Sequence, residues 1–406
     1  MHIVVISQFF WPDLSGASQL ATDLVRELVR RGVKVTVVAG ESSTGGDNDT
    51  EPPAAEIVRV SEFRFARNSL IRTLSYLSFF ALVLGCLPRL READLIITLT
   101  NPPLLPFVGT IFQSLTRARH VIWEMDMYPD LAVDLGVLVP GSLVTRLSGA
   151  LIDFSRRRAQ YIISLGPCMT RRLLARGTPE NKIRLAESWA DGELYKPASR
   201  RTPSGRVTVL YAGNMGLAHD FDSISAAMME LKADPRFHFS FIGDGCRMDA
   251  LKKFCESHGV SNAHFGSFKP PRRLVAEDFT TASVGLVTQN SACSGTVVPS
   301  KIYGLLAAGL PVIFIGPGNA TPALTIKQFQ CGWHIECGRG EELVSLLRIQ
   351  ADNPRLVSEA GARARRAFQD HFALPLGVDR ICRILGVATT IGPNRVSVPG
   401  VEITHD

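Results

Sequence analysis

Lys301 is the residue whose setting most directly suggests chemistry. It follows Pro299 and Ser300, and proline suits a first helical turn, whose amide hydrogens have no partner inside the helix. The sequence therefore predicts a helix that begins near Pro299 and ends at Gly309. Free amide hydrogens, the positive end of the helix dipole and the Lys301 ammonium together suit a phosphate. A sheet-covering helix with a solvated lysine is an equal alternative for this stretch taken alone.

Three glycine-containing turns follow predicted strands, where a glycine lets the backbone approach a phosphate closely. They are Ser15-Gly16-Ala17, Gly213-Asn214-Met215-Gly216 and Gly243-Asp244-Gly245. Because Met248 stands where the fingerprint Gly-x-Gly-x-x-Gly needs its last glycine, a nicotinamide-dependent dehydrogenase is disfavoured. A nucleotide held between two facing sheets fits all three turns, although each turn alone can be a plain tight turn.

Asp126 is the carboxylate best placed to act on a substrate. It lies just past a predicted strand, residues 120–123, and before Pro129; an N-cap or turn aspartate is the alternative. Carboxylate pairs that could hold a metal occur three times, at Asp47/Asp49, Asp220/Asp222 and Glu124/Asp126. A pattern this frequent discriminates little, so no obligatory metal is expected. The sequence also lacks Gly-x-Ser-x-Gly, His-Glu-x-x-His and the Walker lysine loop.

The composition restricts the class of protein. A chain of 406 residues exceeds what one core usually supports, so two domains are expected. The net charge of +6 allows an anionic partner, but the chain lacks the dense alternation of basic and aromatic residues found in nucleic-acid binders. Eight cysteines without a Cys-x-x-Cys pair indicate the reducing cytoplasm rather than a disulfide framework or a zinc site. The N-terminus does not resemble a signal peptide.

An uncharged apolar stretch spans residues 74–87, which is too short to cross a membrane. The flanking arginines are Arg59, Arg64, Arg67, Arg72, Arg89 and Arg91. This pattern is compatible with a helix that touches an anionic bilayer from the cytoplasmic side. A core helix with solvated flanks is the favoured interpretation for the apolar residues, and it leaves the arginines free to face lipid.

The elements that must position these residues alternate between short apolar runs and amphipathic helical segments. A strand at 3–7, a helix with an apolar stripe from Leu20 to Val29 and a strand at 33–39 form one βαβ unit. Further strands are expected at 95–99, 120–123, 161–164, 207–211, 237–242, 263–265, 283–288 and 312–315. The predicted class is α/β, with two facing Rossmann-like domains, parallel sheets and a cleft between them.

The domain boundaries follow from composition. Residues 1–192 form the N-terminal domain, 193–206 a Pro-, Ser- and Arg-rich linker, and 207–374 the C-terminal domain. A last helix is expected over 376–387, and residues 388–406 lose periodicity and are expected to form a weakly ordered tail.

In order along about three hundred residues, several segments resemble the retaining glycosyltransferases of family 4, which have the GT-B architecture. The likeness is greatest to the bacterial branch that builds O-antigen, capsule and exopolysaccharide, similar to the L-fucosamine transferases. The matching segments are 7–12 with Gly16-Ala17, Thr100-Asn101-Pro102-Pro103-Leu104, Trp123-Glu124-Met125-Asp126-Met127-Tyr128-Pro129-Asp130, Leu210–Gly216, Phe241–Gly245, and 298–301 with 309–312. Each segment alone is weak, and together they are specific.

The resemblance implies a sugar nucleotide, most simply a UDP-sugar, held mainly by the C-terminal domain, with the acceptor on the N-terminal domain and no bound metal. It places Gly16 by the donor phosphates, Asn214 and Lys301 on the diphosphate, and Asp126 at the reacting sugar. The remaining implied donor-side residues are Gly213, Gly216, Gly243, Gly245, Arg247, Val298, Pro299 and Ser300. The implied acceptor-side residues are Trp11, Pro12, Asp126 and Tyr128. The family's last helix commonly crosses back onto the first domain.

Two departures from the family pattern stand out. Many members have a Glu-x7-Glu pair whose second glutamate holds the nucleotide ribose, and Thr296 and Gly304 occupy those positions here. The basic residues that often follow the glycine-rich turn are also missing, because the chain reads Leu217-Ala218-His219-Asp220. Lys301, helped by Arg247, then becomes the main candidate to compensate the charge of the diphosphate.

The expected function is transfer of a hexose or N-acetylhexosamine to a polyprenyl-diphosphate-linked acceptor at the inner face of the cytoplasmic membrane. A soluble natural-product acceptor is one alternative. A nucleotide-sugar epimerase, which shares the architecture and needs no acceptor, is a second. A non-catalytic binding module, suggested by the missing glutamate, is a third.

Overall fold

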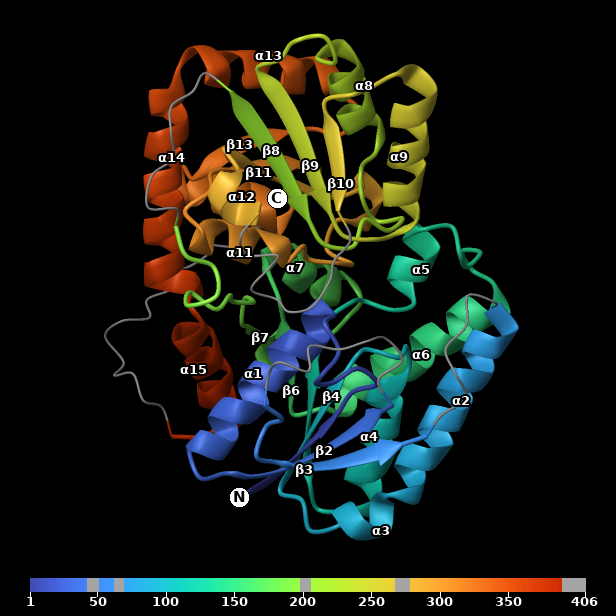
Figure 1. Cartoon of the computed structure of the whole chain (residues 1–406). Helices are drawn as coiled ribbons and strands as arrows, with labels where there is room; N and C mark the ends of the chain where they lie inside the picture. Colours follow the sequence, from blue (N-terminus) through green and yellow to red (C-terminus); the bar gives the residue numbers. More distant parts are fainter. Residues whose placement is uncertain (42–50, 62–68, 198–205, 267–277, 389–406) are drawn as a thin grey trace.

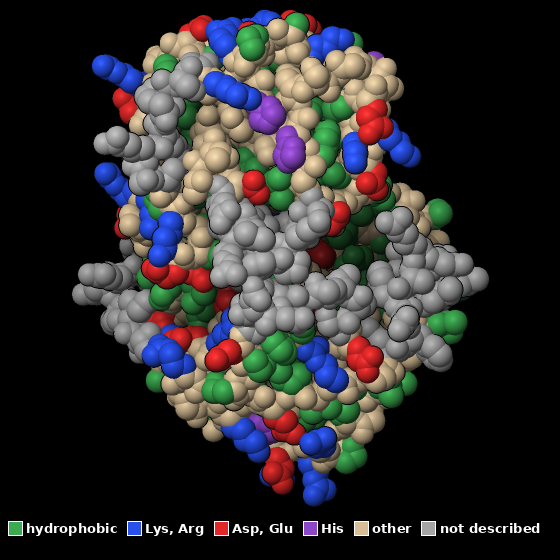
Figure 2. Space-filling model, viewed as in Figure 1, with side chains coloured by type: hydrophobic (Ala, Val, Ile, Leu, Met, Phe, Trp, Pro, Cys, Tyr) green, Lys and Arg blue, Asp and Glu red, His purple; other side chains and the backbone are tan. Residues whose placement is uncertain are grey.

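The computed structural model of the chain contains two α/β domains stacked one above the other (Figure 1). It describes residues 1–41, 51–61, 69–197, 206–266 and 278–388. Figure 2 shows that the surface is hollowed between the two domains. This arrangement confirms the predicted α/β class with two parallel-sheet domains.

The N-terminal domain has a seven-stranded parallel sheet with the order β3-β2-β1-β4-β5-β6-β7. The strands are β1 (His2–Ile6), β2 (Lys34–Gly40), β3 (Glu56–Val60), β4 (Leu95–Leu99), β5 (Arg119–Trp123), β6 (Tyr161–Ser164) and β7 (Ile183–Leu185). The helices are α1 (Gly16–Arg30), α2 (Ser69–Gly85), α3 (Leu87–Leu90), α4 (Leu105–Leu115), α5 (Asp130–Asp134), α6 (Leu143–Arg158) and α7 (Pro167–Ala175). Because helices cover both faces, the central strand β4 is buried along its whole length.

The C-terminal domain has a six-stranded parallel sheet with the order β10-β9-β8-β11-β12-β13. The strands are β8 (Val207–Ala212), β9 (Phe237–Ile242), β10 (Ala263–Gly266), β11 (Val284–Thr288), β12 (Val312–Ile315) and β13 (Gly332–Ile335). The helices are α8 (Asp222–Glu230), α9 (Cys246–His258), α11 (Lys301–Ala307), α12 (Thr321–Phe329), α13 (Gly340–Asp352) and α14 (Pro354–Ala367). Strand order reverses at β8 in this sheet and at β1 in the other, so ligands are expected where these strands end.

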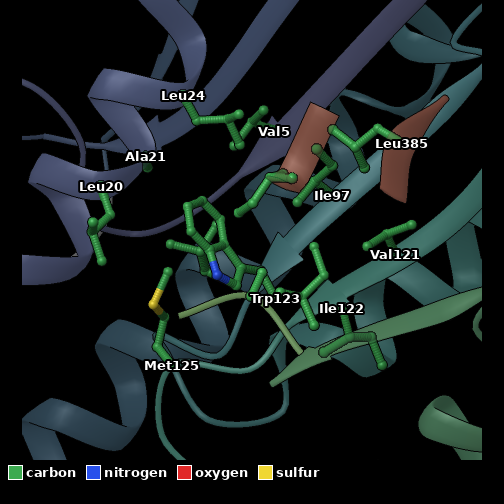
Figure 3. Packing of buried hydrophobic residues seen from close by; sticks show 14 of the residues in the cluster. Val5, Leu20, Ala21, Leu24, Ile97, Val121, Ile122, Trp123, Met125 and Leu385 are labelled. Carbon is green, nitrogen blue, oxygen red and sulfur yellow. The ribbon is translucent and has the colours of Figure 1, made fainter. Parts of the chain in front are cut away.

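The last helix, α15 (Leu374–Leu385), joins the N-terminal domain although it follows the C-terminal domain in the chain (Figure 1). Its Val378, Ile381 and Leu385 belong to the same buried cluster as Trp123, and Figure 3 shows Leu385 in this cluster. The Arg31 guanidinium, at the end of α1, donates to the buried Asp379 carboxylate at 2.6 Å. The expected last helix lies almost wholly within α15, whereas residues 198–205 of the linker and 389–406 of the tail lie outside the described residues.

The apolar stretch before residue 87 forms most of α2, and only one side of this helix enters the core. Phe79 and Val83 are buried, whereas Leu74 and Leu77 are exposed. No helix in the described parts of the chain is both long and apolar enough to cross a bilayer. One side of α2 is thus a core helix as the sequence favoured, and contact of its exposed side with lipid stays a prediction.

The arginines around α2 include one that does not face outward. Arg59 is half-buried and donates to the carbonyl oxygens of Gly40 and Trp11, which corrects the expectation that this guanidinium is free to face lipid. Arg89 pairs with Glu56 at 3.0 Å. Arg64 and Arg67 lie outside the described residues.

Candidate active site

A cavity of about 340 Å³ lies between the domains. The N-terminal domain contributes the start of α1 and the turn before it, and the C-terminal domain contributes the end of β8 and the start of α11. Five residues predicted to bind the donor line the cavity, namely Gly16, Gly213, Asn214, Ser300 and Lys301. The structure thus brings together, from both domains, the core of the predicted phosphate site.

The helix that carries Lys301 is shorter than expected. It begins at Lys301 rather than near Pro299, and Ala307 is its last residue, with Gly309 in the left-handed conformation just beyond. A helix of two turns has a weak dipole, so its amide hydrogens contribute less than the sequence suggested. The positive charge of Lys301 is the stronger feature of the site.

The Lys301 ammonium is held by three acceptors. Its Nζ donates to Tyr211 Oη at 2.6 Å, to the Asn214 carbonyl oxygen at 2.6 Å and to His219 Nε2 at 2.8 Å. It also lies 4.7 Å from the centre of the Tyr211 ring. All three hydrogens of the ammonium are therefore directed, and the charge is fixed beside the glycine-rich turn that follows β8.

His219 is a site residue that the sequence did not reveal. Its Nδ1 lies 3.2 Å from the Gly216 carbonyl oxygen, an arrangement that assigns the ring hydrogen to Nδ1 and leaves Nε2 to accept from Lys301. Burial lowers the pKa of His219 to about 3, and the charge of Lys301 is the second cause. The hydrogen bond to Gly216 acts in the opposite direction and raises this pKa. The ring is therefore neutral at physiological pH and acts as an acceptor for the ammonium.

Burial lowers the pKa of the Lys301 ammonium to about 7. Near neutral pH a group with this pKa responds strongly to a neighbouring charge. A diphosphate in the cavity would favour the charged form, so anion binding and proton uptake are linked at this residue.

Two glycines in the cavity lie beside side chains at the start of α11, and one of them, Gly213, is required by a close approach. A Cβ on Gly213, whose φ is 128°, would lie 2.6 Å from Lys301 Cε, so only glycine leaves room for the lysine chain. A Cβ on Gly16 would lie 3.4 Å from Ser300 Oγ, across the domain boundary. Gly16 of the N-terminal domain thus lies beside Ser300, and Gly213 lies beside the Lys301 side chain, within the same cavity.

The other predicted donor residues do not line this cavity. They are Gly216, Gly243, Gly245, Arg247, Val298 and Pro299. A Cβ on Gly243 would lie 2.2 Å from the Gly213 carbonyl oxygen, so the second turn packs beneath the first turn and supports it. Arg247 lies over the Phe221 ring, 6.0 Å from its centre, instead of lining the cavity beside Lys301.

Asp126 lies at the domain boundary but does not line the cavity. Its backbone forms an antiparallel bridge with Val297, and its amide donates to Thr100 Oγ1 at 3.0 Å. Burial raises the pKa of the Asp126 carboxyl to about 6, and the charge of Glu124 is the second cause. A hydrogen bond from Asn101 acts in the opposite direction and lowers this pKa. The other acceptor-side residues, Trp11, Pro12 and Tyr128, are likewise not among those that line the cavity.

The carboxylate pairs have structural partners where the structure describes them. Glu124 forms a buried ion pair with Arg156 at 2.7 Å, and Asp220 accepts from the Ser223 amide at 3.0 Å. Asp47 and Asp49 lie outside the described residues. Among the residues that the structure describes, no three His, Cys, Asp or Glu side chains gather as metal ligands would.

An aromatic pair stands where the family pattern has its second glutamate. A Cβ on Gly304 would lie 3.6 Å from the Tyr195 ring, which is 4.9 Å from the Phe279 ring. Both rings and Gly304 line the cavity. Thr296, at the position of the first glutamate, donates to Asp134 at 3.0 Å across the domain boundary.

Known proteins with similar sequences carry transferase names. Residues 15–189 match the family model described as a glycosyl transferase 4-like domain. The probable glycosyltransferase WbjE of Pseudomonas aeruginosa is 24% identical over 396 residues, covering 93% of this chain and 96% of that protein. The putative colanic acid biosynthesis glycosyl transferase WcaI of Escherichia coli strain K12 is 22% identical over 336 residues, covering 76% of this chain and 82% of that protein.

The fold is shared with a solved nucleotide complex. HepE of Anabaena, solved in complex with UDP and glucose, has a TM-score of 0.73 at 15% identity, covering 95% of this chain and 99% of that chain. The epimerase alternative is not favoured, since the matching curated proteins are named as transferases. Retention and the likeness to L-fucosamine transferases stay predictions.

Proposed function

We propose that this chain, which has the GT-B fold and resembles transferases over most of its length, is a glycosyltransferase that moves a hexose or N-acetylhexosamine from a UDP-sugar to a lipid-linked glycan, with retention of configuration. The observation that carries this proposal is the Lys301 ammonium, fixed by three acceptors in the cavity between the domains. UDP is the favoured nucleotide because HepE, which shares the fold, was solved with UDP.

The chemistry needs a departing diphosphate whose growing negative charge is stabilised. A preorganised cation in a partly closed cavity provides this stabilisation without proton transfer, because its partners already hold it in place. Lys301 meets this requirement, and Ser300 and Asn214 line the cavity beside it. Asp126 follows strand β5 and bridges Val297 of the C-terminal domain. This aspartate is assigned to the reacting sugar.

The acceptor is a polyprenyl-diphosphate-linked intermediate in the synthesis of a cell-surface polysaccharide, met at the inner face of the cytoplasmic membrane. WcaI, one of the similar proteins, is named for colanic acid biosynthesis. The exposed Leu74 and Leu77 on α2 also suit contact with a lipid surface.

A donor screen followed by a transfer assay tests the proposal. One UDP-sugar is expected to raise the melting temperature, since a ligand that binds only the folded state stabilises it in proportion to occupancy. With a polyprenyl-diphosphate glycan in vesicles, the product should keep the anomeric configuration of the donor by NMR. A new sugar nucleotide formed without acceptor, or hydrolysis alone with every acceptor, would contradict transfer.

A further inference from the structure

Helix α6 has its large apolar side chains on the side that faces solvent. Residues three, four and seven apart share a helix face, so Leu143, Leu147 and Phe154 lie together, and they are 80%, 60% and 44% exposed. The opposite face buries Gly149, Ile152, Ser155 and Arg156. A helix that only covered the sheet would show the reverse pattern, with its apolar stripe turned inward.

The charges on this exposed side are all positive. Arg146, Arg157 and Arg158 are exposed and share the face with the leucines. The one acidic residue of the helix, Asp153, turns away from it and pairs with Arg156 and Arg176 of the protein itself. We call Leu143, Val144, Arg146, Leu147, Phe154, Arg157 and Arg158 the outer face of α6.

The apolar surface continues beyond the helix. Val137 and Val139, in the turn between α5 and α6, are 54% and 71% exposed. On the neighbouring side, α4 contacts both α6 and α2, and α2 exposes Leu74 and Leu77. Figure 1 shows α6 and α2 along the same flank of the N-terminal domain.

From this geometry we infer that the outer face of α6 docks on an anionic lipid bilayer and holds the acceptor-binding domain at the membrane surface. Apolar side chains entering the boundary of the acyl region, together with arginines at the headgroups, are the two signals that give stable peripheral binding. A second copy of the chain is a poorer occupant, because two identical faces would oppose arginine to arginine. The inference rests on the proposed lipid-linked acceptor.

Vesicle co-sedimentation tests the docking. Wild-type protein should bind vesicles of phosphatidylglycerol and phosphatidylcholine, and binding should weaken in pure phosphatidylcholine and at high salt. Leu143→Gln with Leu147→Gln, and separately Arg157→Gln with Arg158→Gln, should each lower the partition coefficient about tenfold or more. The matched control is Ile349→Gln with Leu356→Gln, two exposed apolar residues of the C-terminal domain, which should bind like wild type.

Transfer assays separate this inference from the proposed function. The leucine variant should lose turnover with a long-chain acceptor in vesicles and keep turnover with a short-chain, water-soluble diphosphate acceptor. Vesicle binding by wild type without use of any polyprenyl acceptor would refute the proposed acceptor and leave the docking intact. Equal binding by the variants and wild type, or a wild-type dimer that the leucine variant dissociates and that does not bind vesicles, would overturn the docking.

Discussion

At the scale of single residues, the proposed function assigns the diphosphate to Lys301, which lines the cavity. Lys301→Met keeps much of the apolar chain beside Tyr211 and removes the charge, so kcat/KM should fall about 10²-fold or more. Lys327→Met is the matched control, because Lys327 is an exposed lysine on α12 that does not line the cavity. Steady-state kinetics with the identified donor measure both. Full activity of Lys301→Met would refute the role of the ammonium.

His219 acts through Lys301 and should therefore change a pH profile. Its Nε2 accepts from the ammonium, so His219→Leu should lower the pKa of Lys301 further below about 7 and weaken UDP binding at pH 7.5 about tenfold. Because only the protonated lysine attracts the diphosphate, affinity should decline with rising pH, and the decline should begin at lower pH in this variant.

The conservative variant separates positioning from folding. His219→Gln keeps an oxygen that can accept from the ammonium and should restore most of the affinity and the wild-type pH profile. Calorimetry of UDP binding from pH 6 to 9 measures both variants. A uniform loss of affinity in His219→Leu, with no displacement of the profile, would assign His219 a structural role only.

The Asp126 carboxyl makes the folded state less stable as pH rises, because its pKa is raised in the folded protein. Its pKa in the folded protein is about 6, above the ordinary 3.8, so folding takes up a proton between these values and the carboxylate costs stability at higher pH. Asp126→Asn should gain about 1–2 kcal/mol above pH 6.5 and nothing near pH 3.5, measured by urea unfolding. The same variant should bind UDP and transfer poorly. Undiminished transfer would show that Asp126 is structural.

The sequence predicted residues that line the cavity and missed the residues that hold the Lys301 ammonium in place. Lys301 and Gly213 follow from charge and from glycine at a strand end, and Asn214 follows from the family resemblance. Tyr211 and His219 are distant from Lys301 in the chain, and only the fold brings them to the ammonium. The available signal was the histidine just after the glycine-rich turn, at a place where the family often has a cation.

At the scale of elements, the strands that the sequence missed lie at sheet edges. They are β3, β7 and β13, each the terminal strand of its sheet. An edge strand is covered less completely, and β3 and β13 have mostly half-buried residues. Their sequences therefore lack the continuous apolar run that marks β1, β4 and β12.

The crossing of α15 depends on one buried ion pair that joins it to α1. Asp379→Ala leaves the buried Arg31 guanidinium with Glu27 as its remaining ionic partner, so the cost should lie toward the lower end of the range of about 3–5 kcal/mol that breaking a buried pair costs. Replacing both, Arg31→Met with Asp379→Leu, should recover much of that loss, because Glu27 keeps its pair with Arg30 and the partly exposed Arg383 can turn to solvent. Urea unfolding followed by circular dichroism compares the two. A cost below about 1 kcal/mol for Asp379→Ala would mean that apolar packing alone holds α15.

At the scale of the whole molecule, a tight contact joins the two domains away from the residues that line the cavity. Gly166, just before α7, faces Thr321 at the start of α12, and a Cβ on Gly166 would lie 2.0 Å from Thr321 Oγ1. Nearby, Cys168 Sγ lies 3.0 Å from the same oxygen. Both contacts join the N-terminal to the C-terminal domain, and neither Gly166 nor Thr321 lines the cavity.

A methyl group on Gly166 should therefore act as a wedge between the domains. Its φ is 179°, which any residue adopts, so Gly166→Ala brings a steric conflict without backbone strain. We expect a larger radius of gyration by X-ray scattering and a kcat reduced about tenfold, because the Lys301 ammonium and the N-terminal domain no longer meet at the right distance. UDP affinity should change little, since Lys301 and its three partners all belong to one domain.

A second substitution at the contact decides whether the wedge is the cause. Thr321→Gly removes the three nearest atoms that the new methyl group would meet, all within 2.9 Å, so the double variant should regain both the wild-type radius and most of kcat, a strong departure from additivity. Gly85→Ala is the control, because a Cβ there meets no atom within 4 Å. If Gly166→Ala lost activity without any change in radius, or if Thr321→Gly failed to restore it, the separation of the domains would not govern transfer, and the site would depend on the C-terminal domain alone.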